Sequence, residues 1–119
     1  MAEEFETEFV RSLRDLAMGY PGVSEGDSCV NRAFRAGEKG FLYLGENDDT
    51  YRVTVRLGRS LEDATKLSER DPRHYSIGNT GWVTVVMAQG QQPPPGLFAS
   101  WIDESFRLQA HKKLLAELD

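Results

Sequence analysis

Hydrophobic residues near both ends of the chain recur at the spacing of an α-helix. Near the start they follow steps of four, four, three and four residues, which places them on one helical face: Phe5, Phe9, Leu13, Leu16 and Tyr20. Pro21-Gly22 ends this predicted helix. A later helix is predicted from about residue 97 to residue 109, with an inward face of Leu97, Trp101, Ile102, Ser105 and Leu108. Residues 112–118 predict a final helical turn or two.

The middle of the chain alternates between apolar and polar positions, as in a half-buried strand. In residues 51–57, one face carries Tyr51, Val53, Val55 and Leu57 and the other carries Arg52, Thr54 and Arg56. Further strands are predicted over residues 29–36, 41–44, 76–77 and 82–87, whereas the polar residues 24–28 predict a loop. Ser60-Leu61-Glu62-Asp63 resembles a capping box that opens a second helix, which ends at Asp71-Pro72.

The resulting order of elements, α-β-β-β-α-β-β-α, predicts one α+β domain that covers residues 1–119. Short turns between consecutive strands favour a twisted, mainly antiparallel sheet with the helices packed on one face. The arginine-bearing side of residues 51–57 then faces solvent or a partner. A hydrophobic fraction of 39%, with six Phe, four Tyr and two Trp, supplies enough apolar surface for one core.

Charge and cysteine content narrow the classes of protein. The net charge is −5, and residues 1–28 carry seven acidic side chains against Arg11 and Arg14, so most of the acidity lies there. The single cysteine, Cys29, excludes an internal disulfide and an all-thiolate metal site. No apolar run is long enough to cross a bilayer, and the acidic start is unlike a signal peptide, so a cytoplasmic protein is expected.

Five basic residues form the main candidate for a binding surface. Arg52 and Arg56 share one face of a strand about 13 Å apart at strand rise, and neighbouring turns and strands add Arg35, Lys39 and Arg59. Such spacing suits contacts with the phosphates of a nucleic acid. The alternative is a solvated sheet face that Glu38 or Asp49 neutralises, which the acidic composition favours.

Trp82 has two interpretations. With Asn79 and Thr80 it could form a stacking platform at the mouth of a loop. Because it begins an apolar strand, it is more typical of a core residue, although Thr84 gives its side of the strand some polar character.

Several phrases of the sequence resemble the MmcQ/YjbR family, in the expected order and over nearly the whole chain. They are Tyr20-Pro21-Gly22, the hairpin of residues 33–41, residues 81–85, residues 101–108 and Lys112-Lys113-Leu114. The resemblance implies a CyaY-like fold, the frataxin-type α/β sandwich, and the family's DNA-binding label, which rests on a double-wing shape of hairpins flanking a helix. Gly81 departs from the polar or basic residue that many members carry before the tryptophan.

Sites for a metal or a reaction are weaker candidates. Frataxins, similar in fold, hold iron on an acidic ridge, and Glu4 and Glu8 could share a cation, but acidic residues also commonly complement a helix dipole. His74-Tyr75 could be a general acid/base pair, although a loop contact is the commoner role. Cys29 has no histidine in a motif that would activate it.

The sequence therefore predicts a non-catalytic binding module without metal or cofactor, monomeric and not associated with membranes. DNA is the expected partner, with Arg35, Lys39, Arg52, Arg56 and Arg59 on phosphates and Asn79 and Trp82 as secondary contacts. The alternative is a module for a small molecule or a protein, with a pocket around Trp82 and His74.

Overall fold

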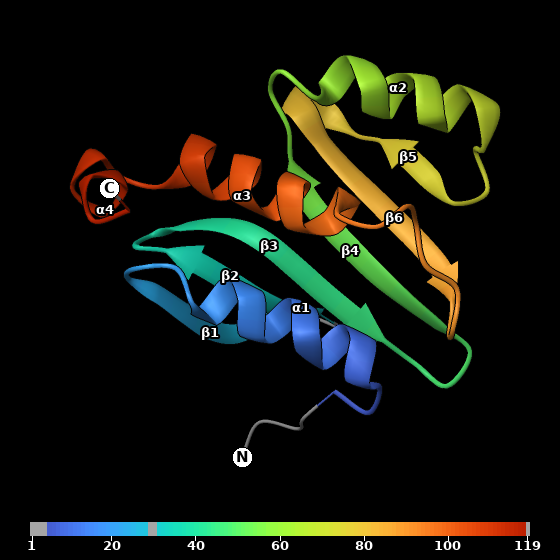
Figure 1. Cartoon of the computed structure of the whole chain (residues 1–119), viewed down its shortest axis with the longest axis horizontal. Coiled ribbons are helices and arrows are strands. Elements are labelled where there is room, and N and C mark those ends of the chain that lie inside the picture. Colours follow the sequence, from blue (N-terminus) through green and yellow to red (C-terminus); the bar gives the residue numbers. More distant parts are fainter. Residues whose placement is uncertain (1–4, 29–30, 119) are drawn as a thin grey trace.

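The computed structural model describes residues 5–28 and 31–118 (Figure 1). Its elements are α1 (Glu8–Met18), β1 (Val23–Ser28), β2 (Asn31–Ala36), β3 (Lys39–Glu46), β4 (Thr50–Arg56), α2 (Leu61–Arg70), β5 (Tyr75–Ile77), the short 3-10 helix η1 (Asn79–Gly81), β6 (Trp82–Ala88), α3 (Leu97–Gln109) and α4 (Lys112–Ala116). None of these helices is long and apolar enough to cross a membrane.

The six strands form one sheet in the order β1-β2-β3-β4-β6-β5, and every neighbouring pair is antiparallel. Figure 1 shows α1 and α3 lying across the same face of this twisted sheet. The predicted α+β class, the antiparallel sheet and the helices on one face are confirmed.

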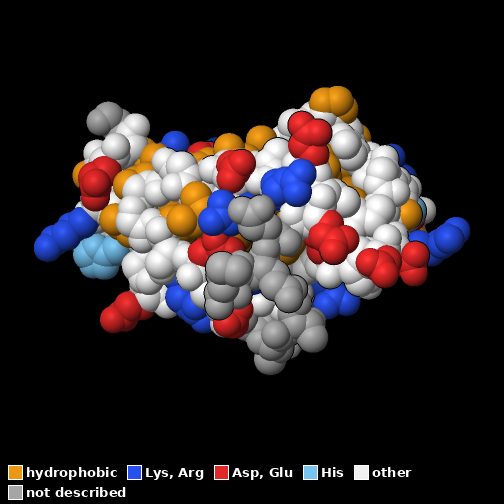
Figure 2. All heavy atoms as spheres, turned by 90° about the horizontal axis from the view of Figure 1, so that it is seen from below, with side chains coloured by type: hydrophobic (Ala, Val, Ile, Leu, Met, Phe, Trp, Pro, Cys, Tyr) orange, Lys and Arg blue, Asp and Glu red, His pale blue; other side chains and the backbone are white. Residues whose placement is uncertain are grey.

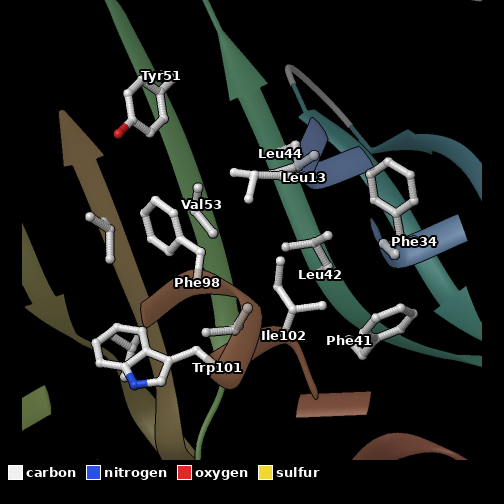
Figure 3. Close-up of a cluster of buried hydrophobic side chains, with 14 of the residues drawn as sticks. Leu13, Phe34, Phe41, Leu42, Leu44, Tyr51, Val53, Phe98, Trp101 and Ile102 are labelled. Atoms are coloured by element: carbon white, nitrogen blue, oxygen red, sulfur yellow. The ribbon is translucent and has the colours of Figure 1, made fainter. Parts of the chain in front are cut away.

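The core lies between the sheet and its helices. Tyr51, Val53, Val55 and Leu57 are at most 3% exposed, as the alternation of β4 predicts. Figure 3 shows Phe98, Trp101 and Ile102 projecting from α3 toward the strands. The opposite face of β4 is therefore left without a covering layer.

The predicted loop over residues 24–28 is wrong, because these residues form the edge strand β1. Glu25 lies on the helix side of this strand, where an apolar side chain would be expected. Its carboxylate accepts hydrogen bonds from Nε of Arg14 at 2.8 Å and Nε of Arg32 at 3.0 Å. Ion pairs with α1 and β2 thus replace the hydrophobic contacts that would have revealed the strand.

The predicted inward faces of two helices are shifted in part. In α1, Val10 and Ala17 are buried whereas Leu16 is 38% exposed, and in α3, Phe106 is buried whereas Leu108 is 46% exposed. A helix that lies flat on a sheet buries a broad face, so several neighbouring faces fit the same hydrophobic spacing.

The N-terminus of α1 is capped by a residue from the sheet. Thr7, at the N-cap position, makes no capping bond with its own side chain. Instead, the Glu46 carboxylate accepts hydrogen bonds from the backbone N–H groups of Glu6 and Thr7 and from Oγ1 of Thr7. Gln89 donates a further one. These bonds lower the pKa of Glu46, although burial acts to raise it, and they attach α1 to the β3–β4 turn.

Glu46→Gln is expected to lower the free energy of unfolding by about 1–2 kcal/mol, because the neutral amide is a weaker cap for α1. Urea denaturation at pH 7 measures the change. Glu38→Gln removes an equal charge from the exposed β2–β3 turn and is the control. Equal effects of the two substitutions would show that net charge, and not the cap, is responsible.

The predicted capping box at Ser60 is wrong. Ser60 makes no side-chain capping bond in α2, and its hydroxyl donates to Glu104 of α3 at 2.6 Å. The same carboxylate accepts the backbone N–H groups of Gly58 and Ser60. The loop between β4 and α2 is therefore folded around a buried carboxylate.

Candidate nucleic-acid interface

The face of the sheet opposite the helices, called here the open face, carries no acidic side chain at its strand positions. The six strands contain three acidic residues, Glu25, Asp27 and Glu46. Glu25 and Asp27 pair with Arg32, and Glu46 caps α1, so alternation places all three on the helix side. The open-face positions include Arg35, Arg52 and Arg56.

Two of these arginines have no acidic partner in the part of the chain that the structure describes. Among residues 5–28 and 31–118, no carboxylate lies within 4.0 Å of the guanidinium of Arg35 or Arg52. Glu38 and Asp49, which were the candidates to neutralise the face, form no ion pair with them. The charges on this face are thus available to a ligand.

The interpretation of Trp82 as a core residue is wrong, because it lies half-buried on the open face. Its ring meets the Tyr43 ring edge to face, with centroids 5.7 Å apart. Tyr43 belongs to β3 and Trp82 to β6, so the two rings meet over the intervening β4, where Thr54 and Thr84 share a hydrogen bond of 3.0 Å. The result is an aromatic pair at the middle of an otherwise polar sheet face.

Two of the remaining predicted site residues lie in strands of the sheet, and two lie outside the strands. Arg56 pairs with Trp82 in the sheet register, but its guanidinium already donates to the Thr80 carbonyl and to Gln109. Lys39 is exposed at the β2–β3 turn, and its register with the core residue Ala36 places it on the helix side of the strand end. Two predicted residues lie away from the strands of the open face: Arg59, whose Nε is 3.7 Å from the Glu104 carboxylate, and Asn79, exposed in η1.

A shallow hollow opens on this face beside Arg52. It has a volume of about 340 Å³ and is lined by Asn31, Gly45, Glu46, Asn47, Thr50, Tyr51, Arg52 and Val86. Gly45 is buried, and a Cβ there would collide with Oδ1 of Asn31, so the glycine makes room for this carboxamide. Oδ1 of Asn31 is buried and has no hydrogen-bond partner in the described part of the chain.

Sequence reasoning missed Tyr43, Asn31 and Gly45. Tyr43 could have been predicted on the open face, because it lies between Leu42 and Leu44 in an alternating strand. Asn31 and Gly45 could not have been predicted, because they come together only across two neighbouring strands.

The glycine that departs from the family pattern has a structural role. Gly81 adopts φ +89°, and a Cβ there would lie 2.6 Å from the carbonyl oxygen of Leu57. A side chain at this position would clash and strain the backbone, so the turn before Trp82 requires glycine here.

The catalytic and metal candidates gain no support as sites. His74 Nδ1 lies 2.7 Å from the Asp71 carboxylate, whereas the Tyr75 ring is buried against Trp101, so His74 and Tyr75 do not form an acid/base pair. Within residues 5–28 and 31–118, no three metal-ligating side chains cluster. Cys29 and Glu4 lie outside the described residues.

Charge is distributed differently on another side of the molecule. In the view from below in Figure 2, Asp and Glu side chains lie among Lys and Arg side chains on the visible surface. That mixture is typical of a solvated protein surface. The absence of acids from the strand positions of the open face is thus a local feature.

Comparison with known proteins supports the fold. The crystal structure of protein DR2400 from Deinococcus radiodurans, which carries a DUF419 domain, aligns with a TM-score of 0.69 at 19% identity. The alignment covers 92% of this chain and 86% of that chain. No curated protein matches the sequence significantly. Residues 18–108 match the YjbR family, and because this match spans most of the chain, the protein belongs to the YjbR family.

Proposed function

We propose that the chain is a non-catalytic, cytoplasmic nucleic-acid-binding module whose binding surface is the open face of the sheet. In this proposal Arg35 and Arg52 contact phosphates, and Lys39 and Arg56 add further phosphate contacts. Bases stack on the pair formed by Tyr43 and Trp82. A monomer is sufficient, because one chain supplies the whole surface.

The separation of charges across the sheet is the observation that carries the proposal. All three acids of the strands lie on the helix side, whereas two arginines on the other side have no carboxylate partner among the described residues. A net charge of −5 opposes binding of a polyanion in general, but phosphate contacts depend on the local field. The aromatic pair adds a surface for base stacking, which a merely solvated sheet face does not need.

The Arg35→Ala, Arg52→Ala double variant is expected to weaken binding to DNA and to reduce the salt dependence. Each lost phosphate contact lowers the slope of log K against log salt by about 1. Fluorescence anisotropy with labelled duplex and single-stranded oligonucleotides, over a series of salt concentrations, measures both quantities.

Arg70→Ala is the matched single-charge control, because Arg70 is exposed at the end of α2 and away from the open face. It is expected to leave the slope unchanged, with Arg52→Ala alone as its counterpart. Binding that does not depend on salt concentration would contradict the proposal. So would a double variant with the affinity and the salt slope of the wild type. The first result would favour a neutral small molecule or a protein as the partner.

A further inference from the structure

The aromatic pair and the hollow are neighbours on the open face. The distance between them bears on which form of nucleic acid can occupy both. Tyr43 lies opposite Thr54 and Trp82 opposite Arg56, which are two and four residues along β4 from Arg52 at the edge of the hollow. At strand rise these separations are about 7 and about 13 Å. Both are at least twice the ~3.4 Å rise per nucleotide in one strand of a duplex. Neighbouring bases bound at both places must therefore be unstacked from each other.

The hollow has the chemistry of a base-binding site. Gly45 and Val86 provide an apolar floor, the Asn31 carboxamide lies against it, and the exposed Arg52 stands at its side. Asn and Arg are the side chains that most often read base edges, because each offers two hydrogen-bonding atoms in a plane. A phosphate would need only positive charge and would gain nothing from the floor.

The buried Oδ1 of Asn31 is a second argument for a base-binding site. Oδ1 has no hydrogen-bond partner among the described residues, and a buried acceptor in this state costs free energy in the folded protein. Rotation about its last side-chain bond exchanges Oδ1 with Nδ2, so the group can present an acceptor or a donor to a base edge. A bound base thus supplies the hydrogen bond that the described protein atoms do not.

A duplex does not fit this arrangement. Its bases are paired and stacked, so their faces are not offered to the aromatic pair, and its major groove admits a helix or a two-stranded ribbon. Proteins that recognise unpaired strands use flat sheets with aromatic residues, on which exposed bases stack.

Resting on the proposed function, we propose that the open face selects single-stranded nucleic acid. One base stacks on the Tyr43–Trp82 pair, and the neighbouring base enters the hollow formed by Asn31, Gly45 and Arg52.

The first experiment compares strands. Wild-type protein is titrated with a labelled single-stranded oligonucleotide and with the duplex of the same sequence, both at 150 mM salt. Single-stranded binding is expected to be at least tenfold tighter, and Trp82→Ala is expected to weaken it about 5- to 150-fold, the range for one lost stacking contact. Equal or tighter binding of the duplex overturns the inference and leaves the proposed function standing. Absence of salt-dependent binding to either overturns both.

The second experiment tests the hollow. Homopolymer strands of dA, dC, dG and dT are compared for the wild type and for Gly45→Ala, whose Cβ displaces Asn31 and fills the floor. The wild type is expected to discriminate among the bases, and the variant to lose this discrimination while keeping its salt slope. A uniform loss of affinity with a smaller salt slope would place a phosphate in the hollow. A wild type without base preference would also overturn the base assignment.

Gly58→Ala is the control for the substitution itself. Its Cβ would meet Leu108 of α3 at an ordinary contact distance of 3.5 Å, on the helix side of the sheet, and its binding is expected to match the wild type. Asn31→Ala is the second variant. It removes the carboxamide without adding a group to β3, so it keeps the test decisive if Gly45→Ala disturbs folding.

Discussion

Glu104→Ala is expected to lower the free energy of unfolding by about 3 kcal/mol. The carboxylate is 6% exposed and accepts hydrogen bonds from the Ser60 hydroxyl and from the backbone N–H groups of Ser60 and Gly58. Alanine removes the partner of these three part-buried donors, and each orphaned donor costs about 1 kcal/mol, the lower end of the range for unsatisfied groups. Urea denaturation at pH 7 measures the loss.

The neighbouring arginine provides the control. Arg59 is 85% exposed and its Nε lies 3.7 Å from the Glu104 carboxylate, so solvent screens the ion pair. Arg59→Ala is expected to cost well under a third of what Glu104→Ala costs. Similar losses for the two variants would mean that the charge pair, and not the hydrogen-bonded loop, holds α2 to α3.

The same carboxylate makes stability depend on pH. Burial acts to raise the pKa of Glu104, but the hydrogen bonds from Ser60 and Gly58, with the Arg59 charge, outweigh it and lower the pKa. A lowered folded-state pKa means that the stabilisation is fully present above the unfolded-state pKa of about 4.3. It is lost as the pH falls through the folded-state pKa. The difference in stability between wild type and Glu104→Gln should therefore be constant from pH 7 to 5 and shrink below about pH 4.

Phe106→Ala is expected to cost about 3–5 kcal/mol, which is a large share of the stability of a domain this size. Phe106 is fully buried, and its ring stacks on Tyr20 at 4.6 Å and meets Phe41 edge to face at 5.2 Å. Its removal leaves a cavity where α3, the segment after α1 and β3 meet. Urea denaturation with an unchanged slope would show that the loss belongs to the folded state.

Leu108→Ala on the same helix is the matched control, since Leu108 is 46% exposed. It is expected to cost no more than about 1 kcal/mol. A cost near that of Phe106→Ala would mean that the last turn of α3 packs into the core, as the hydrophobic spacing alone predicts.

These two residues show what the sequence can and cannot predict about the fold. The bounds of α3 follow from its hydrophobic spacing, but the buried side of its last turn does not. That side depends on where the sheet ends beneath the helix, and both Phe106 and Leu108 satisfy the pattern. The inward face of β4 was predictable residue by residue, because strict alternation has only one inward face, although the strand runs from Thr50 to Arg56 and not over residues 51–57. Strand β1 was not, because Glu25 on its helix side is held by ion pairs with Arg14 and Arg32 and not by apolar contacts, so no hydrophobic alternation marks the strand.

The candidate site was predictable in its charges and not in its shape. Arg52 was identified because its strand alternates, and Arg35 because it lies in a neighbouring strand. The sequence alone favours the core interpretation of Trp82 over the stacking platform, since Val83, Val85 and Val86 make its strand look apolar on both sides. The register with β4 decides which face Trp82 joins, and register is a property of two strands and not of one.

The charge separation across the sheet has a consequence for how the molecule meets a partner. The strand acids on the helix side and the arginines on the acid-free opposite face give the sheet an electric dipole. Beyond a Debye length of ~8 Å at physiological salt, ions screen the charges of this protein, so they attract or repel a polyanion only weakly. Inside that distance the helix layer repels it and the open face attracts it, so only encounters in the correct orientation become productive. Such orientation favours selective capture over rapid association.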